Sequence, residues 1–424
     1  MNPSKNSLKI AVIGSGVAGL VATYLLQRQH QVTLFEKNDY LGGHTRTMLV
    51  PDGPDAGTAL DMGFIVFNDR TYPAFTRLLT QLGVTSRYSE MSFSFHSPKT
   101  NVEYAGTNLR SLFARPTSLF NPSHWRMLLD IIRFNRCALR DLQSSALEEL
   151  TLGGYLATRG YGQGFRENYL LPMGAAIWST PIKGMMGFPA AAFLQFFKNH
   201  GLLTIDDRPR WQTVLGGSHS YVKALENRWN CQVILGARIR KVFREPAVRI
   251  LLEDGSGMHF DKVVIATHAD EALILLGDPS LEESLWLGNW TYQKNLTCLH
   301  TDSSFMPRSR QAWASWNYRR DEDTGGGTAL SVTYDMNRLQ GLKTVRSYFV
   351  TLNPQKTIED QCMISQVEFT HPVYTFESLK SQKELPRLNG LRNTYFCGSY
   401  FRFGFHEDAV QSALAVGKAF GAEL

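Results

Sequence analysis

The sequence predicts an α/β fold whose parallel sheet is assembled from three separate parts of the chain, and three observations support it. Residues 9–36 read as strand, glycine-rich turn, helix and strand. A run suited to a buried strand lies at 262–267, and a strand and a helix follow at 394–421. The remaining segments are rich in aromatic residues, arginine and proline, which favours a second, α+β domain interleaved with the first.

Each element of the sheet has its own signature. The apolar run from Lys9 to Ile13 suits a strand buried on both faces, and residues 20–29 carry apolar side chains at helical spacing. Residues 231–235 and 247–252 are expected to form hairpin strands around Asp254-Gly255. The remaining elements are a second strand at 31–36, a buried strand at 262–267, a third at 394–398 and a helix from about 408 to 421.

The sheet-forming segments define the expected domain limits. The first domain comprises residues 1–85, 206–279 and 386–424, and the second comprises residues 86–205 and 280–385. With 43% hydrophobic and 19% charged residues in 424, most of the chain is not intrinsically disordered.

Charge and cysteine content exclude several classes of protein. The net charge of +6 is mild for this length and does not indicate nucleic-acid binding. Five scattered cysteines without a CxxC pair argue against disulfides and a thiolate zinc site, and no HExxH metal motif occurs. The apolar stretch 10–26 contains three glycines and is too short to span a bilayer. We therefore expect a cytoplasmic protein without a metal, in peripheral contact at most with the inner face of a membrane.

The first turn carries a dinucleotide fingerprint. Gly14, Gly16 and Gly19 form GxGxxG, in which the first glycine allows a tight turn, the second admits a pyrophosphate and the third lets helix and strand pack closely. The helix N-terminus adds amide donors and a partial positive charge. Glu36, 22 residues after Gly14, can accept hydrogen bonds from ribose hydroxyls and would repel a 2′-phosphate. With this context, a fortuitous glycine turn is the weaker reading.

Two further segments favour a flavin dinucleotide. Gly42-Gly43-His44-Thr45 follows the second strand and can approach the same pyrophosphate from the other side, although an ordinary surface turn remains an alternative. Near the C-terminus, Gly398 and Ser399 end a buried strand, and a helix starts close to Asp408. A helix N-terminus directed at a flavin would stabilise negative charge on the reduced ring.

Several segments resemble known flavoproteins. IAVIGSGVAGL, EKNDYLGGHT and YFCGSYFRFGFHEDAVQSA resemble the FAD-dependent amine oxidase and phytoene desaturase superfamily. LDMGFIVFNDRTYP, YLLPMGAAIWSTP, GFPAAAFLQFFKNHGLL, RPRWQTVLGGSHSYV, LHTDSSFMP and AWASWNY are similar to one subfamily. It comprises FAD oxidase-like proteins related to the N-terminal region of plant cyclopropane fatty acid synthases, and its bacterial members are associated with modification of unsaturated fatty acyl chains. The resemblance runs through almost the whole chain.

This resemblance implies a Rossmann-like FAD-binding domain of the GR2 type, an interleaved α+β substrate-binding domain and non-covalent FAD. His44 stands where the family usually has an arginine, and Ile239 falls where backbone atoms bind adenine. The implied cofactor contacts are Gly14, Ser15, Gly16, Val17, Ala18, Gly19, Glu36, Lys37, Gly43, His44, Thr45, Gly63, Phe64, Ile239, Ala266, Gly398, Ser399, Asp408, Ala409 and Val410.

Four residues are candidates for catalysis. Lys294 falls where amine oxidases place a lysine that holds a water near flavin N5, and a surface lysine at a strand start is the other reading. His406 and Glu407 either move protons beside the ring or form a capping and packing pair. Phe405 aligns with an aromatic residue that flanks the substrate and lacks a hydroxyl.

Three other polar side chains have open roles. His300 and Asp302 either form a polar relay or share a structural hydrogen bond. Cys397 is expected to pack rather than to attach the flavin.

The resemblance implies an FAD-dependent oxidoreductase that takes hydride from an apolar substrate, an unsaturated fatty acyl chain of a phospholipid, to flavin N5. The alternatives are an amine oxidase and a non-catalytic flavoprotein partner of a lipid methyltransferase. Residues 109–142 interleave arginines with apolar side chains, a pattern that either faces a core or lies in a bilayer interface. Lipid, membrane and methyltransferase are thus the expected partners.

Overall fold

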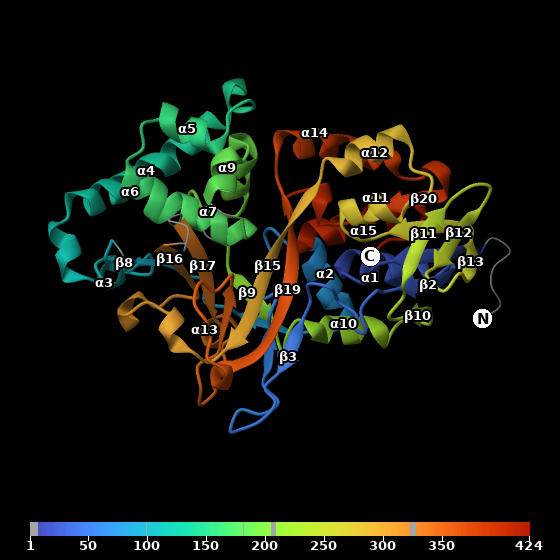
Figure 1. Ribbon diagram of the computed structural model, residues 1–424, viewed down its shortest axis with the longest axis horizontal. Coiled ribbons are helices and arrows are strands. Elements are labelled where there is room, and N and C mark those ends of the chain that lie inside the picture. Colours follow the sequence, from blue (N-terminus) through green and yellow to red (C-terminus); the bar gives the residue numbers. More distant parts are fainter. Residues whose placement is uncertain (1–6, 99, 181, 205–208, 323–327) are drawn as a thin grey trace.

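The computed structural model describes residues 7–98, 100–180, 182–204, 209–322 and 328–424. Figure 1 shows two regions side by side: a sheet wrapped by α1, α11 and α15, and a second region in which a large sheet lies beneath a group of helices. None of the described helices is long and apolar enough to cross a membrane.

A five-stranded, fully parallel sheet forms the first region, in the order β10-β2-β1-β14-β20. Val12 of β1 pairs with Leu34 of β2 on one side and with Val264 of β14 on the other, and all three are buried. The three chain segments expected to share one sheet do so. Its strands are β1 (Lys9–Ile13), β2 (Gln31–Phe35), β10 (Gln232–Ile234), β14 (Lys262–Ile265) and β20 (Thr394–Phe396).

One expected hairpin is wrong. Gln232–Ile234 was expected to pair with the strand near residue 250, but it extends the parallel sheet beside β2 instead. The turn at Asp254-Gly255 connects two other strands, in a three-stranded antiparallel sheet. A three-residue apolar strand carries no signal that separates these partners, because tertiary context decides the pairing. The strands of that sheet are β11 (Ile239–Phe243), β12 (Val248–Leu252) and β13 (Gly257–Phe260).

The second region is built on a seven-stranded sheet in the order β19-β15-β18-β17-β16-β7-β8. Its neighbours are antiparallel except for β16 and β7, which run parallel. The strands are β7 (Phe93–Ser97), β8 (Val102–Ala105), β15 (Thr291–His300), β16 (Trp316–Glu322), β17 (Thr328–Asp335), β18 (Phe349–Leu352) and β19 (Met363–Val373).

Two small sheets connect the regions. Strand β9 pairs with both β5 and β6, so the expected limit at residue 85 passes through one sheet. The limit between 205 and 206 lies outside the described residues. The domain limits as a whole therefore stay a prediction. The strands are β3 (Thr47–Leu49), β4 (Ala59–Asp61), β5 (Phe67–Asn68), β6 (Ser86–Tyr88) and β9 (Trp211–Val214).

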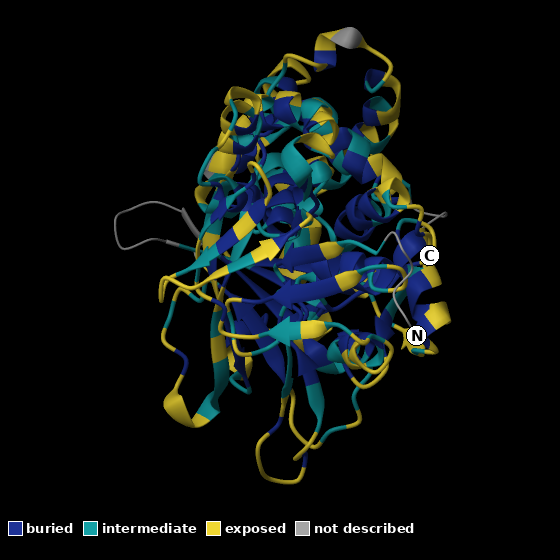
Figure 2. Cartoon of the chain, turned by 90° about the vertical axis from the view of Figure 1, so that its right-hand side faces the viewer, coloured by how far each residue is buried: buried dark blue, intermediate teal, exposed yellow. Residues whose placement is uncertain are grey.

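Helices cover both sheets, and local capping residues set several of their ends. Asn121 accepts from the amide of Ser123 at the start of the longest helix, with Pro122 at its first position. In Figure 2 the central strands are buried while the exposed residues gather on loops and outer helices. The helices are α1 (Val17–Leu26), α2 (Pro73–Leu82), α3 (Leu109–Leu112), α4 (Pro122–Asp141), α5 (Leu152–Thr158), α6 (Gln163–Phe165), α7 (Leu171–Trp178), α8 (Ile182–Gly187), α9 (Ala190–Asn199), α10 (His219–Glu226), α11 (Ala269–Leu275), α12 (Leu281–Gly288), α13 (Met336–Leu339), α14 (Phe376–Glu384) and α15 (His406–Ala419).

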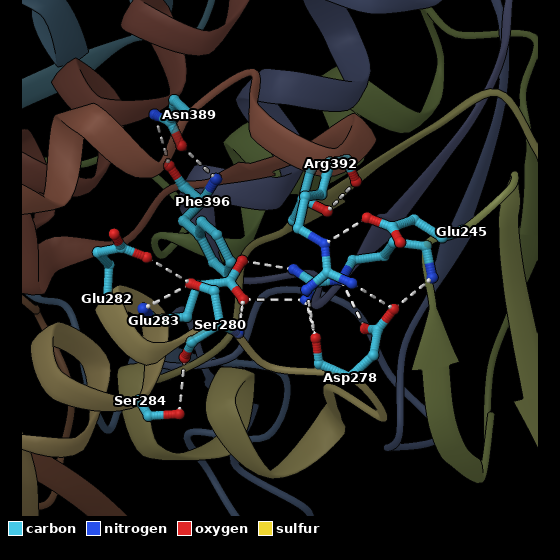
Figure 3. A network of polar contacts seen from close by, with 11 residues as sticks. Glu245, Asp278, Ser280, Glu282, Glu283, Ser284, Asn389, Arg392 and Phe396 are labelled. Atoms are coloured by element: carbon cyan, nitrogen blue, oxygen red, sulfur yellow. Dashed lines mark hydrogen bonds and ion pairs between the residues drawn. The ribbon is translucent and has the colours of Figure 1, made fainter.

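A buried ion-pair network ties the antiparallel hairpin to α12 and to the segment before β20. The guanidinium of Arg244, which is fully buried, binds the carboxylates of Asp278 and Glu283. Arg392 adds ion pairs to Asp278 and Glu245, as Figure 3 shows. These side chains come from three separate parts of the sequence, so the network fixes their relative positions.

We expect Arg244→Ala to destabilise the protein by about 3–5 kcal/mol, because it leaves two carboxylates without their buried cation. Urea unfolding followed by tryptophan fluorescence measures the change. The matched control is Arg238→Ala, which removes an exposed arginine 3.8 Å from Glu253 and should cost less than about 1 kcal/mol. Equal losses in the two variants would mean that the network is not a major source of stability.

Candidate cofactor site and its surroundings

The turn between β1 and α1 fits a pyrophosphate. Gly14 has φ 98°, and a Cβ on Gly19 would lie 1.8 Å from the Gly14 carbonyl oxygen, so both positions require glycine. A Cβ on Gly16 would instead meet nothing within 4 Å. Helix α1 starts at this open position without a side-chain cap or an acidic first turn, which leaves its amides available to an anion.

The second glycine turn faces the first. A Cβ on Gly43 would lie 3.2 Å from the Cα of Gly16, and the amide of Gly42 donates to the Ser15 carbonyl oxygen at 3.0 Å. Gly42 and Gly43 have φ values of 118° and 57°, which favour glycine. The two turns thus approach within van der Waals distance beside the open space at Gly16.

Glu36 lies at the end of β2 with its carboxylate buried beside the first turn. It accepts from the Ser15 amide at 2.9 Å and hydroxyl at 2.6 Å, and from the Asn38 amide and side chain at 2.9 and 2.8 Å. A ribose hydroxyl binding here would exchange with the Ser15 hydroxyl or the Asn38 side-chain amide. Asn38 was not among the predicted residues, because its role depends on the local turn. The ammonium of Lys37 pairs with Glu271 at 2.5 Å.

Other predicted contacts border the same space. Val17 and Ala18 are buried in α1, and the Ala266 carbonyl lies against Gly14. The segment leading to Ile239 runs beside β2, since the Ala237 amide donates to the Glu36 carbonyl oxygen at 2.8 Å. Ile239 itself lies half-buried at the start of β11.

The C-terminal helix α15 packs on α1 and α2. Asp408, Ala409 and Val410 are buried in its first turns, and the Asp408 carboxylate accepts from the Phe405 amide at 2.9 Å. Burial raises the pKa of Asp408 to about 7. Gly398 donates its amide to Ser412 of this helix at 2.9 Å, and the Ser399 carbonyl accepts from the Gly404 amide.

His44 is uncharged at neutral pH. Burial, together with three neighbouring histidines, lowers its pKa well below the ordinary value. Its ring stacks on Phe369 at 4.7 Å between centroids and lies 5.3 Å from His371 and 6.1 Å from His268. His44 therefore supplies no ionic contact where the family pattern has an arginine. His371, His268 and Phe369 were missed, since they come from distant strands and loops.

Gly63, Phe64 and Thr45 are brought together with His406. A Cβ on Gly63 would lie 2.1 Å from the His44 carbonyl oxygen, and the Phe64 ring stacks on the His406 ring at 3.7 Å. Tyr221 links Thr45 and His406, at 2.6 and 3.0 Å. Burial lowers the pKa of His406 to about 3, so it is neutral at physiological pH. A packing role fits these contacts better than proton transfer.

Two catalytic expectations are corrected. The Lys294 side chain is 74% exposed and pairs with Glu368 at 2.9 Å, so it is a surface lysine with no place in a buried site. Glu407 accepts from the amides of Ala74 and Phe75 at 3.0 and 2.9 Å, and thereby caps helix α2. Both reach these positions because alternation along a strand and helix register direct their side chains away from the turns.

The remaining polar candidates are also structural. His300 contacts the Thr351 hydroxyl at 2.7 Å and accepts from the backbone amide of Asp302, whose carboxylate binds Ser304 instead. The Cys397 thiol is fully buried, and burial raises its pKa to about 12, which agrees with packing. In the described part of the chain no three acidic, histidine or cysteine side chains gather in a way that could hold a metal ion.

Phe405 joins an aromatic cluster on the other side of the α15 N-terminus. Its ring stacks on Phe196 at 4.7 Å and lies 6.4 Å from Trp178. Phe188 and Phe193 contact Trp178 in turn, at 4.7 and 5.5 Å. We call these five residues the aromatic cluster. It borders α15 with apolar side chains from helices α7 and α9, which sequence patterns do not bring together.

The model of the flavin-containing amine oxidoreductase family matches residues 17–418. The chain belongs to this family. It is an FAD-dependent oxidoreductase, and the open space at Gly16, beside the two glycine turns, fits the pyrophosphate of that cofactor. The individual cofactor contacts stay predictions. A curated relative is the 1-hydroxycarotenoid 3,4-desaturase of Flavobacterium sp. (strain P99-3), 33% identical over 114 residues. That match covers 27% of this chain and 21% of the relative's length.

Solved structures show the same fold over 98% of the chain. The CLA-producing fatty acid isomerase from P. acnes has a TM-score of 0.67 at 16% identity, with 99% of its own chain covered. The cyclohexylamine oxidase from Brevibacterium oxydans IH-35A has a TM-score of 0.69 at 15% identity, with its whole chain covered.

A pair of glycine variants tests the cofactor turn. Gly16→Ala should leave the fold intact, because φ is −60° and the added methyl meets no protein atom, but it should weaken FAD binding at least about tenfold by occupying pyrophosphate space. Gly19→Ala should lower stability itself. FAD titration and thermal unfolding by circular dichroism distinguish the two. Unchanged FAD affinity in Gly16→Ala would place the pyrophosphate elsewhere.

The pKa of Asp408 predicts a pH-dependent stability. Because it is raised from an ordinary 3.8 to about 7, the folded state holds a proton that the unfolded state releases, and this contribution is lost as the pH rises from 4 to 7. The contribution is up to about 4 kcal/mol. Asp408→Asn should flatten urea stability over that range, whereas Asp39→Asn, at an exposed carboxylate, should not. A parallel pH profile in Asp408→Asn and the parent protein would contradict the assignment.

Proposed function

We propose that this FAD-dependent oxidoreductase desaturates an unsaturated fatty acyl chain of a phospholipid. A hydride is removed from an allylic C–H, and the adjacent carbon loses a proton to water as a new C=C bond forms. The aromatic cluster is the observation that carries this proposal. Phe405 directly precedes α15 and connects its N-terminus with Phe196 and Trp178, so apolar side chains border the start of that helix, where we propose that the acyl chain enters. Such a lining binds hydrocarbon by excluding water and supplies no ionic partner.

The uncharged state of the nearby histidines supports the same substrate class. Burial lowers the pKa of His406 to about 3 and of His371 to about 4, and the pKa of both His44 and His268 also lies below the ordinary value. When bound, FAD supplies the hydride acceptor at flavin N5. The protein would then contribute chiefly substrate positioning, because no protein base is assigned to the proton that the substrate releases to water.

The similar proteins are compatible with this proposal and with one rival. A fatty acid isomerase and a carotenoid desaturase point to long apolar substrates, whereas a cyclohexylamine oxidase points to an amine. Phe405 and the other cluster members carry no phenolic hydroxyl that could hydrogen-bond to an amine nitrogen. A hydrocarbon chain needs no such partner. We therefore rank the lipid first. A role as flavoprotein partner of a lipid methyltransferase remains a further proposal.

Anaerobic flavin reduction distinguishes these functions. The FAD-loaded protein is mixed with unsaturated phospholipid, free unsaturated fatty acid, cyclohexylamine or putrescine, and loss of visible flavin absorbance is followed. We expect bleaching by the unsaturated lipid and none by a saturated one, which lacks the allylic C–H. Bleaching by amines alone would establish the amine oxidase, and bleaching by neither would favour the partner role.

A variant links that reaction to the aromatic cluster. Phe405→Ala should slow reduction by lipid about a hundredfold, since a shift of about 1 Å in substrate position costs that much. FAD content should stay normal. The control is Tyr88→Ala, an exposed aromatic residue of β6, which should reduce at the parent rate.

A further inference from the structure

The segment from α3 to the end of α4 exposes apolar side chains with arginines between them. Phe120, just before α4, is 87% exposed, and Leu129 and Trp125 of α4 are 66% and 46% exposed, although α4 also has a buried side that packs on the protein. Contiguous exposed apolar side chains of this kind mark an interaction surface. We call the following residues the arginine face: Leu109, Arg110, Leu119, Phe120, Trp125, Arg126, Leu129, Ile132, Arg136, Leu139 and Arg140.

Acidic side chains are kept away from this face. Both acids of α4, Asp130 and Asp141, are buried and bonded inward, Asp130 to the Gly162 amide at 2.8 Å and Asp141 to the Tyr155 hydroxyl at 2.9 Å. After Ser123, every exposed residue of α4 is tryptophan, leucine, isoleucine or arginine. The exposed side therefore combines positive charge with apolar surface and carries no compensating negative charge within the helix.

The arginines of α4 differ in how strongly other groups of the protein hold their guanidinium groups. Arg133 is held by Asp130 at 3.0 Å, by the Gly160 carbonyl and over the Tyr161 ring at 4.4 Å. Arg126 and Arg136 have no carboxylate partner among the described residues. Arg140 makes a long ion pair to Asp141 at 3.9 Å and contacts the Cys137 sulfur at 3.7 Å, but its side chain is 70% exposed and stays accessible. Three guanidinium groups on one exposed side are thus available to an anionic partner.

The arrangement fits a lipid surface better than a protein partner. In a protein interface an apolar centre is surrounded by a polar rim, whereas here arginines and apolar side chains alternate along about 30 Å of helix. A helix lying in a bilayer interface requires this alternation, because apolar side chains enter the acyl boundary while arginines reach up to the phosphates. Figure 1 places α3 and α4 at the left end of the molecule and α1, which follows the first glycine turn, in its right half, so docking would leave that turn uncovered.

We propose that the arginine face docks on the surface of an anionic lipid bilayer. The proposal stands independently of the substrate, since it rests on exposure and charge alone. Docking would hold the helical region against the membrane by burial of Phe120, Trp125 and Leu129 and by contacts of Arg126, Arg136 and Arg140 with lipid phosphates.

The test is sedimentation of the full-length, FAD-loaded protein with vesicles of phosphatidylcholine alone or mixed with phosphatidylglycerol. We expect binding to the mixed vesicles that weakens as salt is added. Replacing Arg126, Arg136 and Arg140 together by glutamine should weaken binding about tenfold to a hundredfold. Replacing Phe120, Trp125 and Leu129 together by serine should also weaken it, including at low salt.

Matched controls use exposed residues elsewhere. The charge control replaces Arg238, Arg387 and Lys418 by glutamine and removes the same charge. The apolar control replaces Ile274, Leu281 and Val345 by serine and removes similar apolar surface. Neither control variant should bind the vesicles differently from the parent protein. The proposal would be overturned if the parent protein did not bind anionic vesicles, or if the arginine variant bound them as well as its charge control does. A protein partner would then be the occupant of the arginine face. Flavin reduction by lipid dissolved in detergent reports the proposed function separately.

Discussion

The close approach of α1 to β1 is the constraint on which the cofactor region depends. The carbonyl of Gly14 occupies the position that any side chain at residue 19 would need, and a Cβ on Gly14 would lie 2.7 Å from the Ala266 carbonyl oxygen. This contact brings the N-terminus of α1 against the edge where β1, β2 and β14 end. The second turn then reaches Gly16 through Gly43, and α15 packs on α1. The two glycine turns can approach each other this closely because glycine has no side chain, and α15 completes the region by packing on α1.

Burial determines the chemistry of this region more than charge does. Histidines near the second turn lose their protons because desolvation disfavours the imidazolium, whereas Asp408 retains its proton up to about neutral pH for the same reason. The result is a largely uncharged environment around the start of α15. A flavin can act in such surroundings with few protein acids or bases, because the cofactor carries the electron chemistry.

Charged groups are instead used as structural ties and at the periphery. Glu407 caps α2, and Arg244 joins the hairpin of β11 and β12 to the 278–283 segment through Asp278 and Glu283. On α4 the acids turn inward while arginines face solvent. Each charge is therefore satisfied by nearby backbone, by an opposite charge or by water, as burial requires.

The sequence by itself determined the parallel sheet and the cofactor class. Gly14, Gly16, Gly19 and Glu36 follow a spacing that depends on local backbone geometry, so a pattern of letters is sufficient to predict them. The tertiary structure decided what depends on distant contacts. The three residues Gln232–Ile234 carry no pairing preference of their own, so tertiary context decided that they pair with β2. The register of β15 decided that the Lys294 side chain faces solvent. The partners of His44 and the members of the aromatic cluster come from separate helices, strands and loops, and only packing brings such residues together.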